Sequence, residues 1–236
     1  MATKPNIAPR AVKLERQREK SKNLVFSLGK GFRVLEAFNN RDRELTLTEI
    51  AVRAGLDPGT TFRLVKTLVA LGYLHQAAGV KRYYLGFKVL DLGFNAIARM
   101  ELHETSRPIL RSLVGEVREA ASIGTLDGGE VVYIERVQAG LARLGVDIRI
   151  GSRLPAYCTA IGHSILAYLP RQERLRILEM RPRVKYTDRT LVTVAEIEAR
   201  LQRVRTMGYA LSDQETVPGL RVIAAPILDP DGHPYG

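Results

Sequence analysis

The chain has 236 residues, a length that suits one large domain or two ordinary ones. It is 45% hydrophobic and 26% charged, which is typical of a folded globular protein, and no stretch approaches the roughly 18 apolar residues of a membrane span. A single cysteine excludes an internal disulfide, and the N-terminus lacks the apolar segment of a secretory signal, so we expect a cytoplasmic protein without membrane contact.

The net charge of +11 is concentrated in the first part of the chain. Residues 1–100 carry +10 of it and residues 101–236 carry +1. This asymmetry favours a polyanionic partner for the first part, although charge alone does not choose among nucleic acid, an anionic membrane surface and an acidic protein. Residues 1–24 are rich in Lys and Arg and are predicted to be a disordered basic arm.

Three helical segments follow the arm. Apolar residues at helical spacing between Leu28 and Phe38 predict the first, with Ser27 as its N-cap. The second is expected over residues 48–54, with Thr48 as its N-cap. Asp57-Pro58 predicts the start of the third, which should run to about Leu71.

A short hairpin is predicted next, with strands over residues 73–76 and 82–85 around Ala78-Gly79. Three helices followed by a hairpin are the order of a winged helix-turn-helix, here over residues 25–86. An amphipathic stretch over residues 87–103 is predicted to be a linker helix that dimerises or transmits a signal, because its apolar face needs a partner.

In a helix-turn-helix, the recognition helix turns one face to the major groove and packs the other face on its neighbours. We predict that the third helix buries Phe62, Val65, Leu68 and Val69. Small and basic residues would then meet DNA, since arginine suits guanine edges and lysine and threonine suit phosphates. The predicted DNA-binding residues are Thr48, Gly59, Thr60, Thr61, Arg63, Lys66, Thr67, Lys81 and Arg82. A small helical domain with solvated charges is the alternative.

Residues 104–236 form a second predicted domain of mixed helices and strands. Helices are expected over residues 105–119, with Ile109, Leu110, Leu113 and Val117 as the apolar face, and over 159–169, 171–180 and 194–207. Strands are expected over 121–126, 131–137, 144–150, 208–212 and 220–228, the first two joined by Asp127-Gly128-Gly129. Hairpin connections favour an α+β domain over a doubly wound sheet.

The run LTLTEIAVRAGLDPGTTFRLVKTLVALGYL, residues 45–74, resembles the N-terminal domain of the isocitrate lyase regulator (IclR) family. Residues 151–170 and 208–232 resemble the family's effector-binding domain, so the resemblance covers all but the arm. It implies an α+β protein in which a winged helix-turn-helix and a linker helix precede a GAF-like α/β effector-binding domain. SDQETVPGLRVIAAPI, residues 212–227, looks most like the β-ketoadipate-pathway branch, whose members regulate aromatic-acid catabolism.

This resemblance implies a small organic acid as effector, and the branch that it favours implies an aromatic or related carboxylic acid. Residues 157–160 open a helix whose N–H groups favour an anion, and Ser212 and Val222 match positions of effector contacts in the family. The predicted effector-binding residues are Arg143, Tyr157, Cys158, Thr159, Ala160, Ser212, Glu215, Arg221 and Val222. The two arginines are equally well explained as surface residues, and Glu215 as a structural hydrogen-bond partner.

Two features depart from the family pattern. His163 stands where a lysine is usual, which puts any inherited role of that lysine in doubt. The family usually continues beyond the position of Gly236 with another strand and a helix, so we expect a closing segment to be missing here.

The sequence gives little support to the hypothesis that the chain is an enzyme. Residues 162–166 lack the final glycine of a nucleophile elbow, and the single cysteine and four histidines are too dispersed for a metal site, so no cofactor or metal is expected. We expect a transcription regulator that binds a palindromic operator in double-stranded DNA as a homodimer or a dimer of dimers. The alternative is a non-specific nucleic-acid-binding protein with a C-terminal oligomerisation domain.

Overall fold

The computed structural model describes residues 24–39, 42–98, 102–140 and 148–236. The chain divides into two compact units, Met1–Ala96 and Ile97–Gly236. The predicted basic arm, apart from Leu24, lies outside the described residues. Among the helices that the structure describes, none is both long and apolar enough to cross a membrane.

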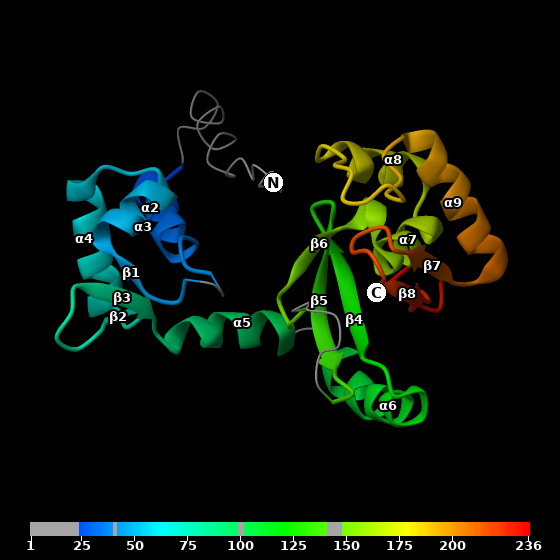
Figure 1. Cartoon of the computed structure of the whole chain (residues 1–236), viewed down its shortest axis with the longest axis horizontal. Coiled ribbons are helices and arrows are strands. Elements are labelled where there is room, and N and C mark those ends of the chain that lie inside the picture. Colours follow the sequence, from blue (N-terminus) through cyan, green and yellow to red (C-terminus); the bar gives the residue numbers. More distant parts are fainter. Residues whose placement is uncertain (1–23, 40–41, 99–101, 141–147) are drawn as a thin grey trace. The chain divides into compact units, whose positions relative to one another are not determined.

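The N-terminal unit combines helices with a small antiparallel sheet (Figure 1). Its helices are α2 (Phe26–Leu35), α3 (Leu47–Ala54) and α4 (Pro58–Ala70), and α5 (Lys88–Ala98) follows and crosses the boundary to the next unit. Strands β1 (Leu45–Thr46), β2 (Leu74–Gln76) and β3 (Arg82–Leu85) lie in the order β1-β3-β2. The predicted order of three helices and a hairpin is confirmed, and β1 is an addition to it.

Side-chain caps decide where these helices begin. Asp57 caps α4 as predicted, since its Oδ1 accepts a hydrogen bond from the Thr60 N–H at 2.8 Å. The cap predicted at Thr48 is wrong, because Thr46 and Glu49 form a capping box that starts α3 earlier. The cap predicted at Ser27 is also wrong: α2 begins at Phe26, so Ser27 lies inside its first turn.

The core of this unit joins all three helices to the sheet. Val34 of α2, Leu45 of β1, Ile50 of α3, Val65 of α4 and Leu74 of β2 are each at most 1% exposed. Full burial of such a side chain contributes about 1.5–3 kcal/mol to the stability of the fold. The cluster therefore holds α4 against α2, α3 and the sheet.

The C-terminal unit contains two antiparallel sheets. The strands β4 (Ala121–Asp127), β5 (Glu130–Val137) and β6 (Arg153–Pro155) form one sheet, and β7 (Ala210–Asp213) and β8 (Arg221–Ala224) form the other. The helices are α6 (Leu102–Val117), the short 3-10 helix η1 (Ala156–Cys158), α7 (Ala160–Tyr168), α8 (Arg171–Glu179) and α9 (Val194–Met207). The α+β class and the hairpin connections are confirmed.

The turn between β4 and β5 shows why the sequence locates this hairpin well. Gly128 and Gly129 have φ angles of 59° and 87°, the left-handed values that a two-residue hairpin turn requires. By contrast, the strand predicted over residues 144–150 is not found in its described part, residues 148–150, and residues 144–147 lie outside the described residues. The third strand of this sheet is β6 instead, which pairs with β5.

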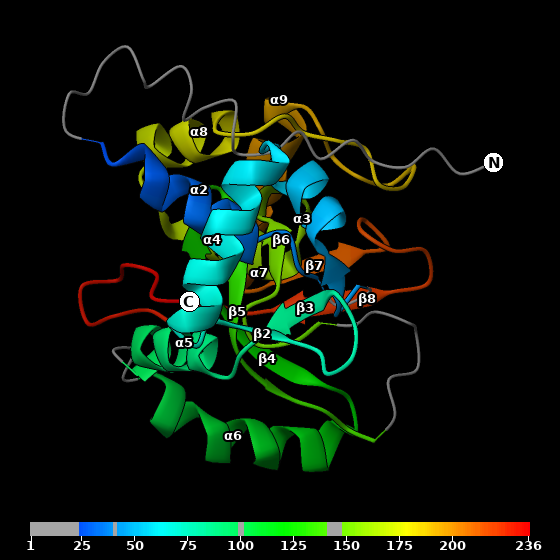
Figure 2. The same ribbon diagram turned by 90° about the vertical axis from the view of Figure 1, so that its left-hand side faces the viewer.

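Helix α6 lies across the β4–β5 pair (Figures 1 and 2). It begins at Leu102, so the domain start predicted at Glu104 falls within the helix. It buries Ser106, Leu110 and Val114, whereas Ile109, Leu113 and Val117 are exposed. The predicted apolar face of this helix is therefore right for Leu110 only. The prediction is wrong for Ile109, Leu113 and Val117, which form a second apolar row that is exposed.

Helix α7 occupies the centre of the C-terminal unit, where it contacts α9 and strands of both sheets. Its residues 162–167 are all buried, and Leu166 and Ala167 have no exposed surface. Thr159 caps the helix, as its Oγ1 accepts a hydrogen bond from the Gly162 N–H at 3.2 Å. The start of α7 is therefore an interior position.

Candidate nucleic-acid interface and effector site

The buried row of α4 begins one residue earlier than predicted, at Thr61 instead of Phe62. The helix buries Thr61, Val65 and Leu68, which follow one another at helical spacings of four and three. Thr61 has no exposed surface, and its hydroxyl donates to the Asp57 carbonyl at 2.8 Å, while Phe62 is 47% exposed. The predicted burial of Phe62 and outward position of Thr61 are both wrong, because a small threonine with a local hydrogen bond fits this interior position.

The outward face of α4 carries small and basic side chains. Gly59, Arg63 and Lys66 are exposed and lie within an arc of about 60° when each residue turns the helix by about 100°. The ion pairs found among the described residues involve neither Arg63 nor Lys66, so both cations face solvent. Two predicted residues flank this face: Thr67, which is exposed, and Thr60, which is partly buried.

The remaining predicted DNA-binding residues lie outside α4. Lys81 is exposed in the turn before β3, and Thr48 is exposed in the first turn of α3. Arg82 is partly engaged within the unit, since its Nη1 donates to the Glu44 carbonyl at 3.0 Å and lies 3.8 Å from Glu49 Oε2. Hydrogen bonds from Thr46 lower the pKa of Glu49, so this carboxylate stays charged beside Arg82.

The predicted effector residues of the C-terminal unit are largely brought together. Tyr157, Cys158, Ala160 and Val222 belong to one apolar cluster, and Ser212 of β7 pairs directly with Val222 of β8. Most of them are enclosed, and Cys158 has no exposed surface. Burial raises the pKa of the Cys158 thiol to about 12, so the thiol is neutral and is not an activated nucleophile.

Several polar groups in this region are already satisfied. The Tyr157 hydroxyl donates to the Val184 carbonyl at 2.6 Å and accepts from the Val184 N–H at 2.7 Å. The Thr159 hydroxyl donates to the Pro155 carbonyl at 3.1 Å while it caps α7. Thr159 therefore holds the backbone at the start of α7, and Tyr157 connects this region to the backbone of Val184.

Three polar side chains lie together near this apolar cluster, those of His163, Arg200 and Glu215. Arg200 Nη1 lies 2.6 Å from Glu215 Oε1, and Glu215 is 2% exposed. His163 Nε2 lies 2.6 Å from the Tyr157 carbonyl, and burial lowers the pKa of this histidine to about 4. Burial also raises the pKa of Glu215, against the opposing effect of Arg200. The sequence flagged His163 only as a departure from the family pattern.

The two predicted arginines give no anion site in the described structure. Arg143 lies outside the described residues. Arg221 is exposed and its Nε lies 2.6 Å from Asp213 Oδ1, so it pairs with a carboxylate of the same unit. Asp213 also pairs with Arg189.

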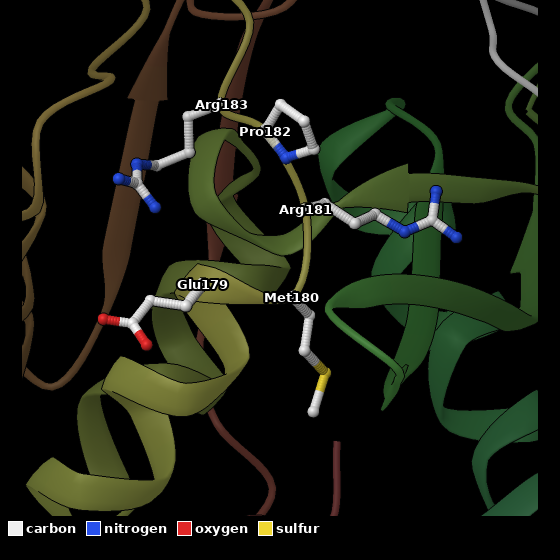
Figure 3. Close-up of a pocket in the computed structure, with 5 residues that line it drawn as sticks. All are labelled: Glu179, Met180, Arg181, Pro182 and Arg183. Atoms are coloured by element: carbon white, nitrogen blue, oxygen red, sulfur yellow. The ribbon is translucent and has the colours of Figure 1, made fainter. Parts of the chain in front are cut away.

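Two hollows on the described surface lie away from the predicted effector residues. One, of about 370 Å³, is lined by residues 179–183 (Figure 3). Arg181 and Arg183 point in different directions there; Arg181 pairs with Glu130, and Arg183 donates to backbone carbonyls. The other, of about 280 Å³, lies between the β4–β5 turn, α7, α8 and residues 234–235. Neither presents converging polar groups for a carboxylate.

The described residues contain no group of three or more His, Cys, Asp or Glu side chains placed to hold a metal ion.

Comparison with known families identifies the family to which the chain is related. Residues 27–78 match the model of the IclR helix-turn-helix domain, and residues 94–236 match that of the bacterial transcriptional regulator IclR C-terminal domain.

The chain belongs to the IclR family. Its relatives include the Pca regulon regulatory protein of Pseudomonas putida, which is 34% identical over 89% of this chain and 72% of the relative. The transcriptional regulator KdgR of Escherichia coli K12 is 33% identical over 89% of this chain and 80% of its own length. The two identities are nearly equal, so they do not assign this IclR-family chain to a branch.

Solved structures of the same family share the fold. A transcriptional regulator from Rhodococcus sp. RHA1 is 37% identical, with a TM-score of 0.76 over 89% of this chain and 83% of that one. An IclR homologue from Microbacterium hydrocarbonoxydans in complex with 4-hydroxybenzoate is 24% identical, with a TM-score of 0.77 over 88% and 85% of the two chains.

The IclR-family chain is therefore a transcriptional regulator with an N-terminal helix-turn-helix domain for DNA binding and a C-terminal α/β effector domain. The prediction of a regulator rather than an enzyme is confirmed by the relatives, which are transcriptional regulators.

Proposed function

We propose that this regulator binds a two-fold symmetric operator through the outward face of α4, under the control of a small organic acid held in the C-terminal unit. The observation that carries the proposal is the pair of exposed cations, Arg63 and Lys66, on the face of α4 opposite its buried residues. The N-terminal turns of a recognition helix enter the major groove, where arginine matches the edge of guanine.

The proposed interface comprises exposed or partly exposed residues of three elements. Thr48 and Lys81 would contact phosphates on either side of α4, and Arg82 would do so with the part of its guanidinium that Glu44 leaves free. On α4 the proposed contacts are Gly59, Thr60, Arg63, Lys66 and Thr67. Thr61 has no surface to offer DNA and instead holds the first turn of the helix.

We further propose that the regulator acts in the cytoplasm as a homodimer or a dimer of dimers. A palindromic operator presents successive major grooves about 34 Å apart, which a two-fold dimer matches. Leu90 and Phe94 of α5, which lie about 40° apart around the helix, are 50% and 64% exposed, so this helix offers an apolar surface for a second copy.

The DNA proposal is tested with a duplex enriched by the wild-type protein from a random pool. Arg63→Ala should bind that duplex about 10-fold to 100-fold more weakly, at the level of about 1–3 kcal/mol for a base contact, and Lys66→Ala should also bind more weakly because it loses a phosphate contact. Arg203→Ala, which removes an exposed arginine from α9, is the matched control and should bind like the wild type. Unchanged binding by both α4 variants would refute the assignment of the recognition face.

For the effector, we propose an aromatic or related carboxylic acid that contacts residues 157–160, Ser212, Glu215 and Val222. Its carboxylate would pair with Arg143, or with Arg221 once this arginine releases Asp213. Support comes from the pairing of Ser212 with Val222 beside Cys158, from the resemblance to the Pca regulon regulatory protein, and from the 4-hydroxybenzoate bound by a structural neighbour. Because these residues are enclosed, ligand entry would favour a more open state of this region.

A thermal-shift screen of aromatic and aliphatic carboxylates tests this part. A ligand at 100 times its Kd should add about 2.7 kcal/mol of stability, and Val222→Trp should abolish the shift because the indole would occupy the volume that the proposed ligand needs beside Ser212. If no aromatic acid stabilises the protein while an aliphatic acid does, the resemblance to aromatic-acid regulators does not extend to the ligand.

A further inference from the structure

The exposed ring of Phe62 has no role in the DNA contacts proposed above. It is the fifth residue of α4 and is 47% exposed, although the same helix buries Thr61, Val65 and Leu68 beside it. A phenyl ring left half in water loses much of the free energy that its burial would contribute. We therefore expect a binding partner to cover the Phe62 ring.

Phe62 lies beside Lys66 on α4, between the buried row of the helix and its outward face. At about 100° per residue, Phe62 and Lys66 are about 40° apart and Gly59 is about 60° from Phe62. The Lys66 Nζ lies 5.8 Å from the centre of the Phe62 ring, within the range of a cation–π contact. The ring and the ammonium thus form one surface, apolar at its base and positive at its edge.

That combination fits DNA better than it fits an apolar protein surface, because the neighbouring charges of Arg63 and Lys66 would be costly to bury against an apolar partner. A phenyl ring has no hydrogen-bonding group, so in a major groove its specific contact is the 5-methyl group of thymine. Lys66, held over the ring, would reach the adjacent phosphate.

We propose that Phe62 is a specificity-determining residue that reads a thymine methyl group in each half of the operator, with Lys66 positioned over its ring. This inference rests on the proposed binding of DNA by α4. It adds an apolar contact to the polar contacts of Arg63 and assigns that contact to a residue that the sequence pattern placed in the core.

The test uses the full chain and a duplex enriched by the wild-type protein from a random pool. Each thymine of the enriched sequence is replaced in turn by deoxyuridine, which removes only the methyl group. For the wild type, one thymine in each half should weaken binding about fourfold when replaced, the factor that corresponds to about 0.8 kcal/mol for one buried methyl group.

The variant Phe62→Ala should bind the thymine and deoxyuridine duplexes equally, and Phe62→Leu should keep part of the difference. Phe32→Ala is the matched control, because Phe32 is a phenylalanine of similar exposure, 49%, on α2. It should retain the fourfold effect of the methyl group, even if it alters assembly. The two Phe62 variants together keep the test valid if one of them folds poorly.

Two failures are distinguishable. If the wild type enriches no sequence from the pool, sequence-specific binding itself is refuted. If it enriches a sequence but no thymine shows a methyl effect that Phe62→Ala removes, the role of Phe62 is refuted while DNA binding by α4 stands.

Discussion

The buried His163 should make the C-terminal unit sensitive to acid in a defined way. Its Nε2 lies 2.6 Å from the Tyr157 carbonyl, and since a carbonyl only accepts, Nε2 carries the proton of the neutral ring. Nδ1 is then a buried acceptor that lacks a hydrogen-bond partner among the described residues. Arg200 is the nearby cation, and its charge opposes a second proton on the ring.

The magnitude follows from the pKa in the two states. Burial, with a smaller effect of Arg200, lowers the pKa of His163 from 6.5 to about 4. Between these values the unfolded chain binds the proton and the folded chain does not, so stability falls as the pH decreases from 6.5 towards 4. The full difference is about 3 kcal/mol, and about 2 kcal/mol of it should be lost between pH 7.5 and pH 5.

The perturbation is His163→Gln, because the glutamine amide keeps a donor for the Tyr157 carbonyl and does not titrate. Urea unfolding is followed at pH 7.5 and pH 5 through amide NMR signals of α7, which report the C-terminal unit alone. We expect the variant to lose about 2 kcal/mol less than the wild type on acidification. Glu215, whose pKa burial raises, remains in both proteins, so its opposite pH dependence largely cancels in the comparison.

His233→Gln removes an exposed histidine and is the control, with a pH dependence expected to match that of the wild type. If the curve of His163→Gln also runs parallel to that of the wild type between pH 7.5 and pH 5, the histidine is not held neutral by burial. The reasoning about this interior site would then be refuted.

Three further sets of substitutions test the packing described above. Asp57→Ala should destabilise the N-terminal unit by about 1 kcal/mol and Asp57→Asn by much less, since asparagine keeps the cap of α4; urea midpoints would show this order. Thr61→Val should cost about 1 kcal/mol of stability and leave the DNA affinity of the folded protein unchanged, as measured by urea unfolding and gel shift. Arg200→Ala should destabilise the C-terminal unit by about 3–5 kcal/mol at neutral pH by leaving the buried Glu215 carboxylate unpaired; Arg200→Ala with Glu215→Gln should recover part of that loss in the same assay.

Local signals in the sequence predicted much of this fold. Asp57-Pro58 located the start of α4, and the glycine pair at residues 128–129 located the β4–β5 turn, because a cap and a left-handed turn depend on a few adjacent residues. Strands β1 and β6 were missed because each has only two or three residues and is defined by a partner strand remote in the sequence.

The site was predicted less completely than the fold. On α4 the rows beginning at Thr61 and Phe62 both satisfy helical spacing, so the periodicity could not decide which of the two is buried. The sequence pattern could not predict the polar neighbours of His163 either, because Arg200 belongs to α9 and Glu215 to the segment after β7. In both cases tertiary packing supplies what local sequence lacks.

Sequence-specific recognition of DNA through α4 is the central claim, and the affinity ratio between specific and random duplexes tests it most directly. With the full chain at one fixed salt concentration, a duplex enriched from a random pool should bind at least about 10³-fold more tightly than random DNA of the same length. Arg63→Ala should reduce that ratio. A wild-type ratio close to one would contradict the claim and would favour a protein that binds nucleic acid through charge alone.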